Sequence, residues 1–188
     1  MQQANNITLI ILAGGKSSRM GKDKALLKYK NKTFVQLLFD NLKSNFSEVI
    51  ISSNNPKVKI VGVKTIADEI KDIGPMGGLY TCLKQSNTEI NFIVSVDTPF
   101  VSPKLSSEIV LKSDNYDIAI VSLKNKLQPI IGVYKKNIIP VLEEEINAGM
   151  YKMQKFLEKT NHKIIELDYT FENDLQNLNT QNDYDKLI

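Results

Sequence analysis

The stretch "LAGGKSSRMGKDKALL" (residues 12–27) combines glycines and cations in a pattern that could bind a polyanion. Gly14 and Gly15 lack a Cβ, so the backbone can approach a ligand closely and turn its N–H groups toward an anion. Arg19 and Lys24 add positive charge and N–H donors for phosphate oxygens. The glycine spacing fits neither the P-loop nor the G-x-G-x-x-G pattern. The stretch therefore predicts either an anion-binding loop of another kind or a basic surface turn.

The stretch "SVDTPF" (residues 95–100) places a carboxylate, Asp97, at the end of an apolar run that a proline terminates. A carboxylate at the end of a buried strand, close to bound phosphates, suits Mg²⁺, which takes one or two carboxylates together with phosphates and waters. Alternatively, Asp97 caps a helix that begins near Ser102. Taken together with the glycine-rich stretch, the pattern favours the metal ligand.

A third stretch, "IADEIKDIGPMGGL" (residues 66–79), joins a carboxylate to a glycine-rich turn. Asp68 is expected to end a short strand, and the turn leads into a helix whose first N–H groups suit a base or a phosphate. The alternative interpretation of Gly74, Gly77 and Gly78 is a tight turn followed by close helix packing.

Two further stretches are weak signals when each is read alone. In "LQPIIGVYKK" (residues 127–136), Gln128 is expected to precede a strand. In "NLNT" (residues 177–180), Asn177 and Asn179 are polar side chains in a segment expected to be a loop before a short closing helix.

The elements that must position these residues alternate along the chain. The expected strands are 7–12, 48–53, 91–96, 116–123 and 130–134, and the expected helices are 33–46, 77–86, 104–113 and 137–149. Nearly continuous Ile and Val runs suit strands buried on both faces. We therefore predict an α/β fold: a three-layer α/β/α sandwich with a mostly parallel central sheet, in one domain over residues 1–188. Ligands of such sheets bind beyond the carboxyl ends of the strands, where the stretches above begin.

Composition narrows the class of protein further. The 188 residues are 42% hydrophobic and 24% charged, and the net charge of +3 argues against a nucleic-acid surface. The single cysteine, Cys82, excludes a disulfide framework.

No apolar run approaches the roughly 20 residues that span a bilayer. No positive charge precedes the apolar run 7–12, so we expect a cytoplasmic protein without a membrane partner. The acidic run 143–145 is expected to be the solvated face of its helix.

Taken in order, these five stretches resemble the molybdenum cofactor guanylyltransferase (MobA) family of molybdopterin-guanine dinucleotide biosynthesis, over nearly the whole chain. The spacing "GGxSxRMGxDK" in the first stretch is the most specific part. The resemblance implies a Rossmann-like nucleotidyltransferase fold and transfer of GMP from GTP to molybdenum-molybdopterin, with Mg²⁺ as cofactor and pyrophosphate as product. It also implies delivery of the product to molybdoenzyme apo-proteins or their chaperones.

The resemblance also assigns roles to individual residues. The catalytic residues would be Arg19, Lys24 and Asp97, and Asp97 would bind Mg²⁺. The nucleotide would be bound by Leu12, Ala13, Gly14, Gly15, Lys24, Ser52, Asp68, Gly77 and Asp97. The pterin side would be contacted by Gln128, Asn177 and Asn179. In this reaction the substrate phosphate attacks the α-phosphorus, so positioning and charge neutralisation replace a protein nucleophile.

The chain departs from the family pattern at two places. The family often has Asn near Ser52, and Asn54 or Asn55 could substitute for it here. The usual "NxNTP" has Gln181 in place of its proline, which affects the turn expected around Asn179.

Two alternative functions remain open at this point. Related cytidylyltransferases, which act on molybdenum cofactor or on sugar or polyol phosphates, usually have "LAAG" where this chain has "LAGG". Gly14 removes one methyl group beside the base and leaves room for a purine, which favours GTP. The second alternative is a GTP-binding protein that delivers the cofactor without catalysis.

Overall fold

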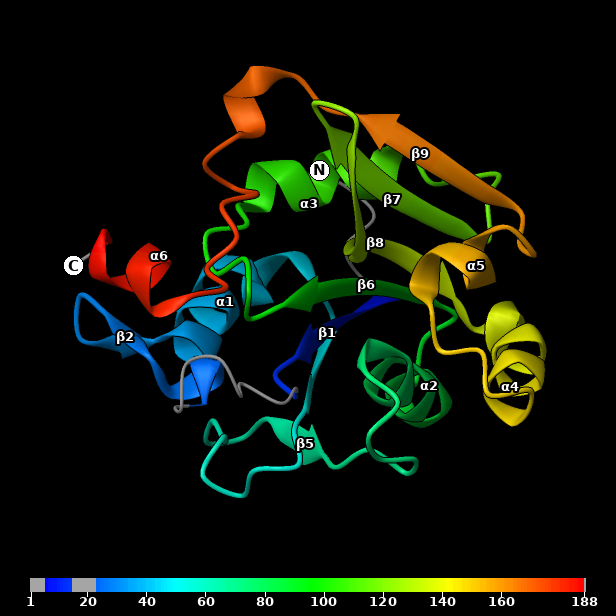
Figure 1. Ribbon diagram of the computed structural model, residues 1–188, viewed down its shortest axis with the longest axis horizontal. Coiled ribbons are helices and arrows are strands. Elements are labelled where there is room, and N and C mark those ends of the chain that lie inside the picture. Colours follow the sequence, from blue (N-terminus) through cyan, green and yellow to red (C-terminus); the bar gives the residue numbers. More distant parts are fainter. Residues whose placement is uncertain (1–5, 15–22, 188) are drawn as a thin grey trace.

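The computed structural model describes residues 6–14 and 23–187, which form one seven-stranded sheet between layers of helices (Figure 1). Across the sheet the strands are β5 (Lys64–Ile66), β4 (Glu48–Ser52), β1 (Ile7–Leu12), β6 (Ile90–Ser95), β8 (Lys126–Lys135), β7 (Ile118–Leu123) and β9 (His162–Glu166). Strand β8 runs antiparallel to both neighbours, and all other adjacent pairs are parallel. The predicted mostly parallel α/β fold is confirmed.

Helices cover both faces of the sheet (Figure 1). The helices α1 (Phe34–Leu42) and α3 (Pro103–Leu111) pack on one face, and α2 (Pro75–Gln85), α4 (Ile139–Asn147) and α5 (Met153–Leu157) pack on the other. Successive strand residues point to opposite faces, so Leu9 and Ile11 of β1 join the first core cluster and Ile10 joins the second. All three are fully buried, which explains why residues 9–12 of β1 are all apolar.

The strand that carries Gly132 begins earlier than expected, because β7 and β8 form a tight hairpin. Lys124 and Asn125 adopt positive φ values of 53° and 60°, as a two-residue hairpin turn requires. Gln128 therefore lies inside β8 and does not precede it. The pairing with β7 shifts at residues 129–131, and this irregularity accommodates a proline, which has no N–H to donate.

Several elements were not predicted from the sequence. These are the hairpin of β2 (Lys28–Tyr29) and β3 (Lys32–Thr33) and the short helix α5. Single turns of 3₁₀ helix are η2 (Lys24–Leu26), η3 (Lys43–Asn45), η4 (Lys136–Ile138) and η5 (Tyr169–Phe171). The expected closing helix is present as α6 (Gln181–Asp185) and lies beside β2 (Figure 1), where the Tyr184 hydroxyl donates to the Lys28 carbonyl.

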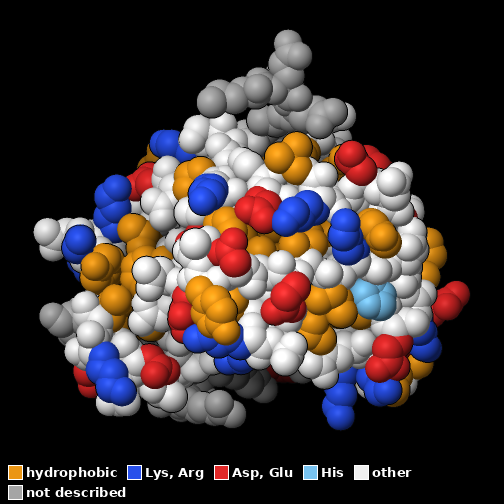
Figure 2. Space-filling model, turned by 90° about the horizontal axis from the view of Figure 1, so that it is seen from above, with side chains coloured by type: hydrophobic (Ala, Val, Ile, Leu, Met, Phe, Trp, Pro, Cys, Tyr) orange, Lys and Arg blue, Asp and Glu red, His pale blue; other side chains and the backbone are white. Residues whose placement is uncertain are grey.

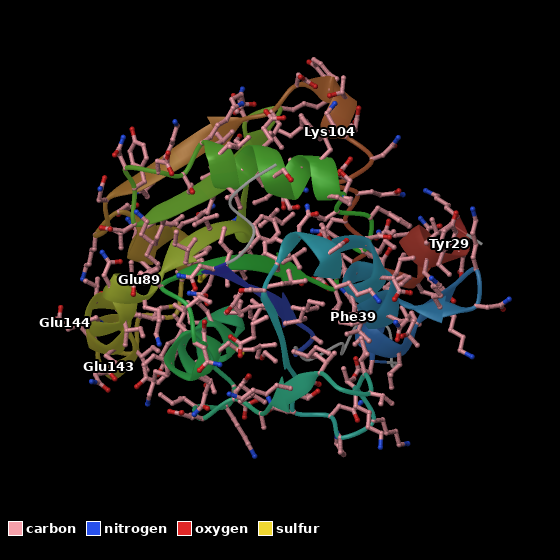
Figure 3. All side chains as sticks on the ribbon, turned by 180° about the vertical axis from the view of Figure 1, so that it is seen from behind. Tyr29, Phe39, Glu89, Lys104, Glu143 and Glu144 are labelled. Atoms are coloured by element: carbon pink, nitrogen blue, oxygen red, sulfur yellow. The ribbon has the colours of Figure 1, made fainter. Side chains whose placement is uncertain are left out.

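The expectation of a solvated acidic face on α4 is wrong for one of its three glutamates. Glu143 and Glu144 are exposed at the outer end of the molecule (Figure 3). Glu145 is only 2% exposed and forms an ion pair with Lys159, because the segment that contains α5 covers its side of α4.

The surface above α3 and β9 carries acidic and basic side chains that are interspersed (Figure 2). This face does not present charge of one sign. Within residues 6–14 and 23–187, each helix is too short or too polar to cross a bilayer.

Candidate functional site

The carboxyl ends of four strands meet at one edge of the sheet. Leu12 pairs with Ser52 of β4 and Ser95 of β6, and Ser52 pairs in turn with Ile66 of β5. The segments that follow β1, β4 and β5 line a cleft of about 580 Å³. Its lining includes Ala13, Gly14, Asp23, Ser53, Asn54, Asn55, Asp68, Lys71, Asp72 and Gly74. The cleft therefore lies where ligands of open α/β sheets bind.

Two residues predicted to act on phosphates form an ion pair beside this cleft. The 3₁₀ turn η2 begins after Asp23, whose Oδ1 accepts the Ala25 N–H at 3.0 Å and caps the turn. Lys24, the first residue of the turn, donates from Nζ to Asp97 Oδ1 at 2.9 Å. The side chains of Lys24 and Asp97 are 12% and 31% exposed, so the pair is largely shielded from water while the carboxylate remains accessible.

Asp97 does not cap helix α3. Ser102 caps this helix itself, because its Oγ accepts the Leu105 N–H at 3.2 Å, and Asp174 Oδ1 accepts the Ser102 N–H at 2.8 Å. The described residues contain no group of three or more His, Cys, Asp or Glu side chains that could hold a metal. A single accessible carboxylate would nevertheless fit Mg²⁺ if a phosphate were bound beside it, because the other ligands of Mg²⁺ are commonly phosphates and waters.

Asp68 is held in a fixed orientation at the end of the cleft. Ser52 Oγ donates to its Oδ1 at 2.8 Å, and Asn54 Nδ2 donates to its Oδ2 at 3.1 Å. Asn54 Oδ1 also accepts the Asp68 N–H at 3.0 Å. Each carboxylate oxygen has a second lone pair, so Asp68 can still accept a bond from a ligand. Asn54 lines the cleft, whereas Ser52 is buried and contacts Asp68.

A second carboxylate of the lining, Asp23, was not predicted as a site residue. Its Oδ2 accepts from Asn55 Nδ2 at 2.6 Å, so Asp23 is joined to the loop after β4. Both side chains line the cleft. The preference of Asp for the position before a helical turn was the sequence signal that could have identified its capping role. Lys71 and Asp72 of the lining were also missed.

The glycines of the third stretch serve helix packing more than ligand contact. A Cβ on Gly77 would lie 2.5 Å from the Ile70 carbonyl oxygen, and a Cβ on Gly78 would lie 2.5 Å from Ser52 Oγ. Because both residues lack a Cβ, α2 can approach the sheet closely. Gly74, with φ of 69°, precedes the helix and lines the cleft, whereas Gly77 is buried and is not part of the lining.

The C-terminal segment reaches the same ion pair. Asn179 Oδ1 accepts from Lys24 Nζ at 2.8 Å, and the Leu178 N–H donates to the Asp97 carbonyl at 2.8 Å. Asn177 Oδ1 is buried and has no hydrogen-bond partner among the described residues. Gln128 is buried in β8 opposite Val121 and is not part of the cleft lining.

The replacement of the expected proline by Gln181 leaves the turn intact. Gln181 is the first residue of α6, a position where proline is favoured but not required. The side chains of Thr180 and Asp183 form a reciprocal capping box that defines the helix start instead.

The remaining predicted residues are placed as follows. Ala13 and Gly14 line the cleft, while the Leu12 side chain is buried in the core and its carbonyl accepts the Val96 N–H at 3.1 Å. Gly15 and Arg19 lie outside the described residues, and their roles stay predictions.

Cys82 lies near the cleft but is poorly suited to nucleophilic catalysis. Burial, and secondarily the negative charge of Asp68, raises the pKa of the Cys82 thiol to about 12. The thiol is therefore protonated and unreactive near neutral pH.

A mostly parallel sheet with a polar cleft at its carboxyl edge and a shielded Lys–Asp pair beside it is an arrangement suited to holding and reacting nucleoside phosphates. With the matching family model, these features define a nucleotidyltransferase. Residues 9–164 match the model of the MobA-like NTP transferase domain, and the chain belongs to that family.

Relatives match the chain over nearly its full length. A Flavobacterium johnsoniae protein named "Probable molybdenum cofactor guanylyltransferase" is 31% identical over 182 residues, which cover 96% of each chain. A Carboxydothermus hydrogenoformans protein of the same name is 32% identical over 188 residues, covering 97% of this chain and 95% of the relative.

Solved structures share the fold. A structure from Aquifex aeolicus VF5 superposes with a TM-score of 0.80 at 30% identity and covers 93% of this chain and 94% of its own. The molybdopterin-guanine dinucleotide biosynthesis protein A from Archaeoglobus fulgidus gives a TM-score of 0.81 at 20% identity, with 96% of each chain covered.

Proposed function

We propose that the protein transfers GMP from GTP to molybdenum-molybdopterin, with Mg²⁺, and releases pyrophosphate. The observation that carries this proposal is the shielded Lys24–Asp97 pair beside the cleft at the carboxyl edge of the sheet. The names of the full-length relatives support the choice of substrates. The terminal phosphate of the pterin would attack the α-phosphorus of GTP, and the bond between the α- and β-phosphates would break.

The residues of the chain would contribute positioning and charge to this step. Lys24 would donate to phosphate oxygens and neutralise charge that develops on the α-phosphate and the leaving pyrophosphate. Asp97 would hold Mg²⁺, which supplies further charge neutralisation when bound. The fixed Asp68 and the backbone at Gly14 would confine the nucleoside in the cleft. Arg19 would contribute to phosphate binding.

The acidic lining of the cleft supports guanine as the base. Asp23, Asp68 and Asp72 line the cleft, and an ionised carboxylate only accepts hydrogen bonds. The Watson–Crick edge of guanine offers two adjacent donors, N1–H and the N2 amino group. The corresponding edge of cytosine offers one amino donor beside two acceptors. Carboxylates at the base end would therefore favour GTP over CTP.

A pyrophosphate-release assay with GTP, Mg²⁺ and molybdenum-molybdopterin tests the proposal. We expect turnover by the unaltered protein and none by Asp97→Ala. Asp40→Ala is a matched control, because Asp40 also forms an ion pair with a lysine, Lys32, at 2.7 Å and is 27% exposed, but it lies on α1. Faster turnover with CTP would identify a cytidylyltransferase. GTP binding without pyrophosphate release would identify a delivery protein and overturn the proposal.

A further inference from the structure

The contact between Asn179 and Lys24 joins residues 155 positions apart in the sequence. The Lys24 ammonium lies 2.8 Å from Asn179 Oδ1 and 2.9 Å from Asp97 Oδ1. An ammonium has only donors, so the amide presents its oxygen and not its nitrogen to Lys24. Two acceptors from different segments therefore contribute to where this cation points.

The backbone at Asn179 is held in place independently of Lys24. Asp183 Oδ2, in the first turn of α6, accepts the Asn179 N–H at 3.1 Å and the Thr180 N–H at 2.8 Å. On the other side, the fully buried Leu178 donates its N–H to the Asp97 carbonyl. The amide of Asn179 is thus delivered to Lys24 by a segment that is anchored at both ends.

We propose that Asn179 is a positioning residue for Lys24, through which the C-terminal segment orients the phosphate-binding cation beside the cleft. A lysine side chain has a long, flexible stem, and a fixed acceptor restricts the directions of its ammonium. A neutral amide does this without adding negative charge to that of Asp97, whereas a second carboxylate at the place of Asn179 would compete further with the phosphates. The inference rests on the proposed function only in its claim that Lys24 contacts phosphate.

Chemical labelling of lysines tests the contact without any nucleotide. Acetylation of Lys24 by acetic anhydride, measured by mass spectrometry relative to Lys32 in the same digest, should be several-fold faster in Asn179→Ala than in the unaltered protein. Gln181→Ala is the matched control, because this neighbouring amide donates to Asp185 within α6 and has no bond to Lys24. Equal Lys24 labelling in all three proteins would refute the positioning role.

Titration calorimetry with GTP and Mg²⁺ tests the consequence for the site. Loss of one hydrogen bond to a charged group predicts about tenfold weaker GTP binding in Asn179→Ala. If Asn179 acts through Lys24, the same substitution in a Lys24→Met background should add little further loss. Independent, additive losses in the two backgrounds would overturn the proposal.

A conservative variant separates orientation from charge. Asn179→Asp keeps an oxygen at the acceptor position, so Lys24 labelling should stay slow while GTP binding weakens because of the added negative charge. Fast labelling in this variant would contradict the proposal. If the unaltered protein fails to bind GTP, the proposed function fails, and the labelling result alone still decides whether Asn179 positions Lys24.

Discussion

Substitution of Gly14 by Ala adds one methyl group at the end of β1, and the geometry of the site predicts its effect on base selection. The new Cβ would lie 3.8 Å from Asp68 Oδ2 and 4.0 Å from the Ser52 carbonyl oxygen. These are ordinary van der Waals distances, so the fold needs no adjustment. The methyl group would instead occupy space in the cleft beside Asp68. We therefore expect the thermal unfolding temperature to stay unchanged while nucleotide selectivity shifts.

The magnitude follows from the size of the group. One methyl or methylene in a binding pocket changes discrimination by about 10- to 200-fold, or roughly 1–3 kcal/mol. Gly14→Ala should lower the ratio of GTP to CTP affinity within this range, as measured by titration calorimetry with each nucleotide and Mg²⁺. An unchanged ratio would refute the role of Gly14 in favouring a purine.

A second glycine provides the contrasting control for this experiment. A Cβ on Gly78 would lie 2.5 Å from Ser52 Oγ and 3.3 Å from Asp68 Oδ1, which is too close without movement of both side chains. Gly78→Ala should lower the unfolding temperature, because overpacking of a core costs about 1–3 kcal/mol. If Gly14→Ala were equally destabilised, the geometry on which the prediction rests would be wrong.

Two further predictions concern stability. Gly132→Ala should lower the free energy of unfolding by about 3 kcal/mol in denaturant titrations. The new Cβ would collide with the backbone carbonyl of Ala119, and backbone within the sheet cannot move aside. A variant as stable as the unaltered protein would refute this. Cys82 should not react with a thiol reagent at pH 8 until the protein unfolds. Burial raises the pKa of its thiol from 9.0 to about 12, so the folded state keeps the thiol proton to a higher pH than the unfolded state does. The free energy of unfolding should therefore fall as pH rises from about 9 toward 12. Cys82→Ala should make that decline shallower, and an identical decline would contradict the assignment.

The strands and helices that position the site were largely predictable, because their signals are local. The buried runs of β1, β4 and β6 are rich in Ile and other large apolar residues, and polar residues or turn formers follow within two positions. The start of β8 was misplaced, since the positive φ values at Lys124 and Asn125 and the irregularity at residues 129–131 carry only weak sequence signals. The burial of Glu145 could not be predicted, because it depends on a later segment that covers α4.

The sequence by itself determined which residues stand at the strand ends. Runs of β-branched residues favour strands, and the glycines and prolines that follow such runs end them. It therefore indicated Lys24, Asp68 and Asp97 as candidates for a nucleotide site. Only the tertiary structure decided which of them touch. The parallel register brings the loop after β6 beside η2, and the packing of α6 carries Asn179 to Lys24. Contacts between segments so far apart depend on the packing of the whole chain, which no local pattern records.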